Sequence, residues 1–426
     1  MNLSTTSEVP RGWQLRRLDS LTLPTGQTVD PVDLVEEEVL HISIPSFDAT
    51  GGGVLERPAS IGSAKTRLSG GELLVSKLNP RKPRVLLVKP SRYTILASGE
   101  FIALSPRDVG ADFLRWRLLA DDVRQHLDSQ VRSVTRSHQR IEPGRVLKTW
   151  LAVPRLDEQR RIVAFLDHET EHIRRLTRGE TNLREKLKER RSALAQGLVL
   201  RGLDPSARQH DSGLPTIGPV PAHWGVQQNK SLIREVEDFS TAGDEELLSV
   251  SHLTGVTPRA EKNVNMFMAE SLEGYKRCKP GDLVINTMWA WMGALGIAPM
   301  EGILSPAYGV YRLDQSQMVP EYYGLLYRSP AYVAEMTRYS RGVWWSRQRL
   351  YPDAFLSLKT LLPPLNEQRA IVAAFQATED SMKELDSKLD CSLALLNERR
   401  QALITAAVTG ELDPSSYRRP RELEAA

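Results

Sequence analysis

The run LDEQRRIVA begins at Leu156, and the run LNEQRAIVA begins at Leu365, 209 positions further along the chain. The two copies stay aligned without a gap for about fifty residues, as far as the triplets Leu203-Asp204-Pro205 and Leu412-Asp413-Pro414. A register held over this length divides a chain into equivalent halves. We therefore expect a pseudo-twofold molecule that acts on something with two parts.

Both copies are expected to form long helices, because apolar residues recur every seven positions between charged flanks, as in a coiled-coil seam. The first series comprises Leu166, Ile173, Leu187 and Leu194, with Leu176 and Leu183 at the second seam position. The second series comprises Phe375, Met382, Leu389, Leu396 and Leu403, joined by Leu385 and Ala406. We expect Asp157 and Asn366 to cap the helices, since each follows a proline-containing turn. A helix from about Asp157 to Leu200 is roughly 60 Å long at 1.5 Å per residue. Its seam needs a partner, and the other copy is the nearest candidate.

About 145 residues of mixed character precede each helix. Short apolar strands, such as 72–75 and 282–285, alternate with turn residues, and amphipathic helical stretches follow at 113–127 and 321–339. The fold class is therefore α+β, with two mixed domains and two long helices. The predicted boundaries are 1–155 for the first domain, 156–203 for the first helix, 204–222 for a proline-rich linker, 223–364 for the second domain, 365–413 for the second helix and 414–426 for a flexible tail.

The composition excludes several classes of protein. Of the 426 residues, 41% are hydrophobic and 26% are charged, as in soluble globular proteins. The sequence has no apolar run long enough to span a membrane, and its start lacks the features of a signal peptide. The two cysteines, Cys278 and Cys391, form neither a disulfide nor a metal-ligand pattern. We therefore expect a cytoplasmic protein that does not contact membranes.

The basic residues are clustered, although the net charge is only +3. Five basic residues and no acid lie between Lys77 and Lys89, and four arginines and no acid lie between Arg338 and Arg349. The stretch from Arg124 to Arg145 holds five arginines and two histidines against two acids. Such segregation is typical of a surface that binds a polyanion.

Candidate DNA contacts follow from these clusters, because Arg and Lys bind guanine edges and phosphates, and Asn and Gln bind adenine edges. In the first domain they are Lys77, Asn79, Arg81, Lys82 and Arg84, and then Arg132, Arg136, His138, Gln139 and Arg140. In the second domain they are Asn286, Met288 and Trp289 after a predicted strand, and then Arg341, Trp344, Trp345, Arg347, Gln348 and Arg349. The alternative is a solvated basic loop, or, for the tryptophans, core packing.

The order and duplication of three motifs carry a resemblance over nearly the whole chain. Pro154–Arg160 and Pro363–Arg369 each lead into a long helix, and the stretch from Asp211 to Trp224 leads into the second domain. The run WMGALG from Trp291 is followed by SPAY from Ser305. With these motifs the chain resembles the DNA specificity subunits of type I restriction–modification systems.

The resemblance implies two target recognition domains, each reading one half of a bipartite site in double-stranded DNA. Because the two recognition segments differ, that site should be asymmetric. The resemblance also implies an antiparallel pair of helices that acts as a spacer, and two docked methyltransferase (modification) subunits with restriction subunits in the full complex. S-adenosylmethionine, ATP and Mg²⁺ would belong to those partner chains and not to this one. Residues expected as first-turn caps, as methyltransferase contacts or as both are Glu158, Gln159, Arg160, Glu367, Gln368 and Arg369.

Catalytic motifs are missing from the sequence. It contains no phosphate-binding loop, no Asn/Asp-Pro-Pro-aromatic motif of amino-methyltransferases and no zinc-like spacing. The leading interpretation is thus a non-catalytic DNA-targeting subunit. Two alternatives remain: a coiled-coil scaffold whose basic loops bind RNA or DNA, and an enzyme whose site has no known motif.

Overall fold

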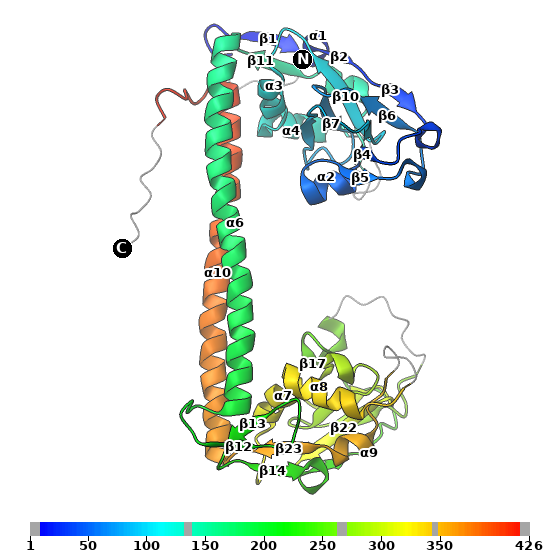
Figure 1. The fold of residues 1–426 in the computed structure, drawn as a ribbon, viewed down its shortest axis with the longest axis vertical. Helices are drawn as coiled ribbons and strands as arrows, with labels where there is room; N and C mark the ends of the chain where they lie inside the picture. The colour runs from blue at the N-terminus through cyan, green and yellow to red at the C-terminus, as the bar shows by residue number, and fades with distance from the viewer. Residues whose placement is uncertain (1–8, 132–138, 262–270, 343–347, 418–426) are drawn as a thin grey trace. The chain divides into compact units, whose positions relative to one another are not determined.

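The computed structural model describes residues 9–131, 139–261, 271–342 and 348–417. The chain forms two compact units, and each is described by itself. The first unit comprises Met1–Thr181 and Asp390–Ala426, and the second comprises Asn182–Leu389 (Figure 1). Among the helices of the described residues, none is long and apolar enough to cross a membrane.

The described residues of the first unit form three sheets and several short helices. The strands are β1 (Gln14–Arg17), β2 (Thr22–Pro24), β3 (Gln27–Val29), β4 (Val39–Ile42), β5 (Val54–Glu56), β6 (Lys65–Leu68), β7 (Leu73–Ser76), β8 (Val85–Leu87), β9 (Ile95–Ala97), β10 (Phe101–Pro106) and β11 (Trp150–Val153). The helices are α1 (Leu18–Leu21), η1 (Pro31–Asp33), α2 (Ile44–Thr50), η2 (Pro58–Ser60), α3 (Ala111–Leu118), α4 (Asp121–Ser129) and α5 (Pro143–Leu147). One sheet has the strand order β2-β10-β7-β8, another has the order β3-β6-β9-β4-β5, and β1 pairs antiparallel with β11.

The second unit repeats part of this connectivity. Its strands are β12 (Gln209–Asp211), β13 (Pro219–Pro221), β14 (Gly225–Gln228), β15 (Ile233–Glu235), β16 (Leu248–Ser251), β17 (Gly255–Pro258), β18 (Lys276–Cys278), β19 (Leu283–Asn286), β20 (Leu295–Ile297), β21 (Gly302–Leu304), β22 (Tyr308–Leu313) and β23 (Lys359–Leu362). Its short helices are η3 (Asn229–Ser231), η4 (Arg259–Glu261), η5 (Ala290–Met292), α7 (Pro320–Arg328), α8 (Pro330–Tyr339) and α9 (Pro352–Ser357). The sheet order β15-β22-β19-β20 matches β2-β10-β7-β8, and the pair β14–β23 matches β1–β11. This repetition confirms the predicted pair of mixed domains.

The central strand of each matching sheet is an apolar run. β7 reads LLVS and β19 reads LVIN, and all their residues are buried, as expected for strands covered on both faces. The helical stretches predicted after the sheets are each divided into two helices. In the second unit the division falls at Ser329, whose hydroxyl accepts a hydrogen bond from the Tyr332 amide, and Pro330 starts the new helix.

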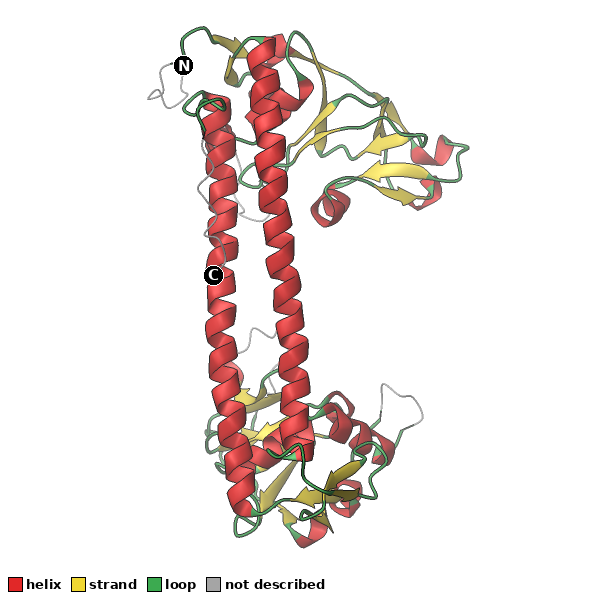
Figure 2. Ribbon diagram, turned by 60° about the vertical axis from the view of Figure 1, so that its left-hand side comes forward, coloured by secondary structure: helices red, strands yellow, loops and turns green. Residues whose placement is uncertain are grey.

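Two long helices run beside the sheets, as predicted, and they are red in Figure 2. They are α6 (Leu156–Arg201) and α10 (Leu365–Thr409). In the first unit, Ile162 and Leu166 share a core with Ile404 and Val408, and Ser392 donates a hydrogen bond of 2.6 Å to Glu180. Residues early in α6 therefore lie beside residues late in α10. The helices are antiparallel within the unit.

The same direction holds inside the second unit. Arg191 of α6 pairs with Glu379 of α10, and Arg184 lies 3.5 Å from Asp386. Gly202, which follows the last residue of α6 and has a φ of +73°, lies against Glu367 in the first turn of α10. Late α6 thus packs on early α10, and polar pairs occupy part of the contact between the helices.

Four of the thirteen predicted seam residues are exposed. Leu166, Ile173 and Leu403 are buried. Six more are partly buried, namely Leu187, Phe375, Met382, Leu389, Leu396 and Ala406, and the four exposed residues are Leu176, Leu183, Leu194 and Leu385. The packed face of α6 instead continues through Glu169 and Thr170. The seven-residue spacing located the helices but not the face that each unit buries, because neighbouring domains also cover the helix surface.

The predicted N-cap positions of both long helices are also wrong. The helices begin at Leu156 and Leu365, so Asp157 and Asn366 lie in their first turns. Segment 204–222, expected to be a linker, carries the small sheet β12–β13 and buries Leu214 and Val220 in the core of the second unit. The segment between α6 and β14 is therefore packed against the second unit through its apolar side chains.

Candidate nucleic-acid interface

Two predicted basic regions of the first unit meet in the structure. The loop after β7 begins at Lys77, whose carbonyl oxygen accepts a hydrogen bond of 3.0 Å from the Ile141 amide. Leu78 forms a bridge with Arg140, and the Asn79 amide donates to the Gln139 carbonyl oxygen at 2.7 Å. The end of the 132–140 region is thus attached to the loop 77–84. We define this surface, residues 77–84 with 139–140, as the first loop cluster.

The first loop cluster contains a tight turn. Asn79 has φ of +49°, a left-handed conformation that Asn tolerates better than most residues, and its carbonyl oxygen accepts from the Lys82 amide at 2.8 Å. This turn presents Arg81 and Lys82 at the surface, where both are exposed, while Lys77, Asn79 and Gln139 are half-buried. The cluster therefore offers exposed cations on an ordered backbone.

Two of the predicted arginines pair with carboxylates of their own unit. Arg84 is only 7% exposed, and its guanidinium donates to both carboxylate oxygens of Asp48, at 2.6 and 2.7 Å. This hydrogen bonding raises the pKa of Arg84 against the opposing effect of burial, and it lowers the pKa of Asp48. Arg140 donates to Glu100 at 2.6 Å but stays exposed. Arg84 thus stabilises the loop, whereas Arg140 remains accessible.

The second unit repeats the attachment. The Thr287 carbonyl oxygen, just after β19, accepts a hydrogen bond of 3.0 Å from the Leu350 amide. Arg341 and Arg349 exchange two backbone hydrogen bonds of 2.9 Å and so form the base of a loop. We define this surface, residues 286–289 with 341–342 and 348–349, as the second loop cluster. It lies at the same place on its sheet as the first, although its side chains differ.

The side chains of the second loop cluster have distinct environments. Asn286 is buried, and its side-chain oxygen accepts from the Met288 amide at 3.2 Å, so it shapes the turn. Trp289 is 50% exposed. Arg341 donates to Asp353 at 2.9 Å, and Arg349 lies 3.7 Å from the Met288 sulfur. Gln348 is half-buried, and both arginines are exposed. The remaining predicted contacts, Arg132, Arg136, His138, Trp344, Trp345 and Arg347, lie outside the described residues.

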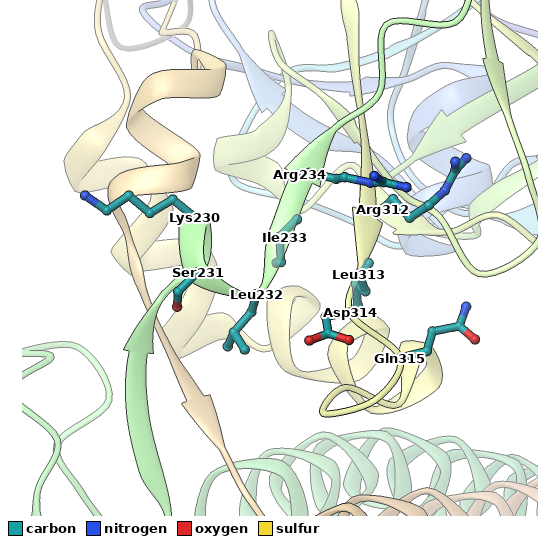
Figure 3. Close-up of a pocket in the computed structure, with 9 residues that line it drawn as sticks. All are labelled: Lys230, Ser231, Leu232, Ile233, Arg234, Arg312, Leu313, Asp314 and Gln315. Atoms are coloured by element: carbon teal, nitrogen blue, oxygen red, sulfur yellow. The ribbon is translucent and has the colours of Figure 1, made fainter.

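A further basic site was missed from the sequence. Arg234 on β15 and Arg312 on β22 are direct cross-strand partners beside a cavity of about 490 Å³ (Figure 3). Arg312 donates twice to Asp282 at 2.9 Å, whereas no hydrogen bond or ion pair of Arg234 is found among the described residues. Figure 3 shows both guanidinium groups on one side of the strands, with Lys230 pointing the other way. The sequence did not reveal which strands are neighbours, so the pair could not be read from it.

The predicted partner-binding residues fall into three kinds. Glu158 and Glu367 each accept a hydrogen bond of 3.0 Å from a domain tryptophan, Trp13 in the first unit and Trp224 in the second. Glu367 also binds His223 at 2.7 Å. These carboxylates therefore attach each domain to the start of a long helix.

Gln159 and Gln368, the next residues along the helices, are 2% and 0% exposed. Their side chains satisfy backbone groups of their own units, which leaves them no surface to offer to a partner in this conformation. Arg160 and Arg369 are exposed. Of each predicted Glu-Gln-Arg triplet, the arginine is the most accessible member.

Among the described residues, no group of three or more His, Cys, Asp or Glu residues could hold a metal ion. Burial, followed by the charge of Asp282, raises the pKa of the Cys278 thiol to about 12, so this cysteine stays protonated at neutral pH. The arrangement offers cations, amides and one exposed tryptophan to a ligand.

Comparison with known proteins identifies the fold. No protein-family model and no curated protein matches the chain. A solved structure concerned with complex assembly and conformational transition of the type I R-M system contains a chain with 19% identity and a TM-score of 0.70, covering 96% of this chain and 100% of that one. The HsdS subunit from Thermoanaerobacter tengcongensis has 20% identity and a TM-score of 0.53, covering 97% of this chain and 100% of that one. The chain thus has the fold of the HsdS subunit of type I restriction–modification systems.

Proposed function

We propose that this chain is the DNA-specificity subunit of a type I restriction–modification complex. The observation that carries the proposal is the pair of loop clusters. Each is attached to its sheet by the same backbone hydrogen bond, Ile141 to Lys77 in one unit and Leu350 to Thr287 in the other. Two loop clusters with the same backbone attachment are suited to a ligand that has two parts, such as a bipartite DNA site.

The exposed residues of the two clusters differ, and so should the DNA sequences that they read. The first loop cluster exposes Arg81, Lys82 and Arg140, and the second exposes Trp289 and two arginines. Arginine binds guanine edges bidentately, and aromatic or apolar side chains contact thymine methyl groups. An asymmetric bipartite site in double-stranded DNA follows from two unlike readers.

The proposed subunit contributes no catalysis of its own. It positions two modification subunits, which bind S-adenosylmethionine, and restriction subunits, which use ATP and Mg²⁺. Such a complex acts in the cytoplasm, where the DNA is. The exposed Arg160 and Arg369 lie in the first turns of the long helices and are candidate contacts for the modification subunits.

The proposal is tested by co-expressing the chain with its modification subunit and mapping methylated positions by sequencing. We expect one asymmetric, bipartite motif that disappears when this chain is omitted. Replacing both Arg81 and Lys82 by Ala should weaken binding of the assembled complex to that motif by about tenfold or more, because each base or phosphate contact contributes on the order of 1–3 kcal/mol. Lys383→Ala, on an exposed helix face, is the matched charge-loss control. Methylation without a bipartite motif, or equal binding by all variants, would refute the proposal.

A further inference from the structure

An interhelical ion pair in the second unit has no counterpart in the first. Arg191 of α6 binds the carboxylate of Glu379 on α10 through Nε, at 2.5 Å, and through Nη2. Glu379 is buried. In the repeat, Arg400 corresponds to Arg191 and Thr170 corresponds to Glu379. The arginine is thus retained in the first unit while its carboxylate is lost.

The described residues of the first unit supply no other carboxylate that pairs with Arg400. The Thr170 hydroxyl donates to the Leu166 carbonyl oxygen at 2.5 Å and carries no charge. Glu169, the preceding residue, lies 3.3 Å from the His168 ring. Among the described residues, no hydrogen bond or ion pair involves Arg400. Burial, together with the charge of Arg115, lowers the pKa of Arg400, so its charged form is stabilised less here than in water.

A cavity lies where the carboxylate would be. Arg400, Thr170 and Arg115 line a space of about 650 Å³ in the first unit. The corresponding cavity of the second unit, lined by Arg191 and Glu379, measures about 380 Å³. The first unit therefore has the arginine, Arg400, and space beside it for a carboxylate. In the second unit Glu379 already occupies the equivalent position.

The charges around this cavity favour a single negative charge. Arg115 donates to Asp167 at 3.3 Å, and Arg174 donates twice to Glu171 at 2.7 Å, so two of the three lining arginines already face carboxylates. Only Arg400 is uncompensated. The three arginines and the two acids, Asp167 and Glu171, leave the lining with one net positive charge, which one carboxylate balances and a doubly charged phosphate would exceed. Glu379 shows that a glutamate carboxylate fits against the equivalent arginine.

We propose that this cavity binds one carboxylate supplied from outside the chain, an acidic side chain of a docked protein that pairs with Arg400. The assignment of that protein as one of the two modification subunits rests on the proposed function. The second unit fills its site with Glu379 and needs no such side chain. Two copies of one partner would then be anchored differently on the two units.

The first test uses the full chain and small anions. Thr170→Glu places in the first unit the carboxylate that Glu379 provides in the second. At constant ionic strength, acetate should raise the Tm of the wild type by about 1–3 °C more than chloride does, by mass action on the folded state. Acetate should have no such effect on Thr170→Glu or on Arg400→Gln. Thr170→Glu should itself raise the Tm, whereas the exposed control Thr181→Glu should not. A wild type that responds equally to acetate and chloride would overturn the site.

The second test identifies the source of the carboxylate. Thr170→Glu and Arg400→Gln should weaken binding of one of two modification subunits by about tenfold in titration calorimetry, as expected for loss of a charged pair, and should leave the other unchanged. Glu379→Thr should create a second acetate site. Stronger protection by inorganic phosphate than by acetate, with weakened DNA binding in Arg400→Gln, would overturn the carboxylate assignment in favour of DNA. If acetate binds as expected but no modification subunit associates, the site stands and the proposed function fails.

Discussion

At the scale of single residues, Gln159 and Gln368 explain why the duplicated motif has its composition. The Gln368 side chain accepts from the Val319 amide at 2.7 Å and donates to the carbonyl oxygens of Gln317, at 2.9 Å, and Pro363, at 2.8 Å. Gln159 accepts from the Gly110 amide and donates to Pro154, both at 2.8 Å. A buried amide that satisfies backbone groups is costly to remove, because those groups are left without water or partner. The glutamines therefore join helix and domain.

Replacing Gln368 by Leu should destabilise the second unit by about 2–4 kcal/mol, since three buried backbone groups lose their partner. Gln159→Leu removes two such bonds and should cost less. Arg369→Ala, next to Gln368 but exposed, should change stability by less than about 0.5 kcal/mol. Hydrogen exchange of backbone amides in each unit measures these effects separately. Equal protection in Gln368→Leu and wild type would show that the amide does not stabilise this junction.

At the scale of elements, periodicity predicted the long helices but mislocated part of their packed face. Leu166 and Leu176 both belong to the predicted seam of α6, yet Leu166 lies in the core of the first unit and Leu176 is exposed. A heptad pattern assumes that one helix covers another. Here the adjoining domain also covers the helix, so burial does not follow the seven-residue spacing.

The two leucines allow a matched comparison on one helix. Leu166→Ala should destabilise the first unit by about 2–5 kcal/mol, because it removes buried methyl groups and leaves a cavity. Leu176→Ala should cost less than about 1 kcal/mol, since this residue is already 39% exposed and lies outside the core. Denaturant titration of the purified chain distinguishes them. Equal losses of stability in the two variants would show that Leu176 is packed as the seven-residue spacing predicted.

At the scale of the whole molecule, both long helices contribute residues to both units: α6 is divided after Thr181 and α10 after Leu389. Under the proposed function, the length of these helices sets the distance between the two DNA half-sites. That length is then a property of the chain that can be changed without altering either loop cluster.

Inserting seven residues at both divisions, after Thr181 and after Leu389, lengthens each helix by about 10 Å at 1.5 Å per residue. This corresponds to about three base pairs of DNA at 3.4 Å each. The methylated motif should keep its two half-sites and gain a spacer longer by about three base pairs, as read by methylation sequencing. Insertion into one helix alone shifts the pairing of Arg191 with Glu379 and should abolish methylation. An unchanged spacer in the double insertion would eliminate the helices as the ruler.

The sequence by itself determined the duplication, the two long helices, the apolar strands β7 and β19 and the position of the basic loops. These features are local, because they depend on residue spacing and composition along the chain. The sequence showed that the two stretches around Lys77 and Ile141 are both basic, but it did not predict the hydrogen bond that joins them.

The tertiary structure alone decided which arginines are available. Arg84 and Arg400 look alike in sequence, each close to other basic residues. Asp48, 36 positions from Arg84 along the chain, pairs with it, whereas Thr170 stands where Arg400 would need an acid. Electrostatic energy depends on distance and burial in space, and the fold sets both by bringing together residues that lie far apart along the chain.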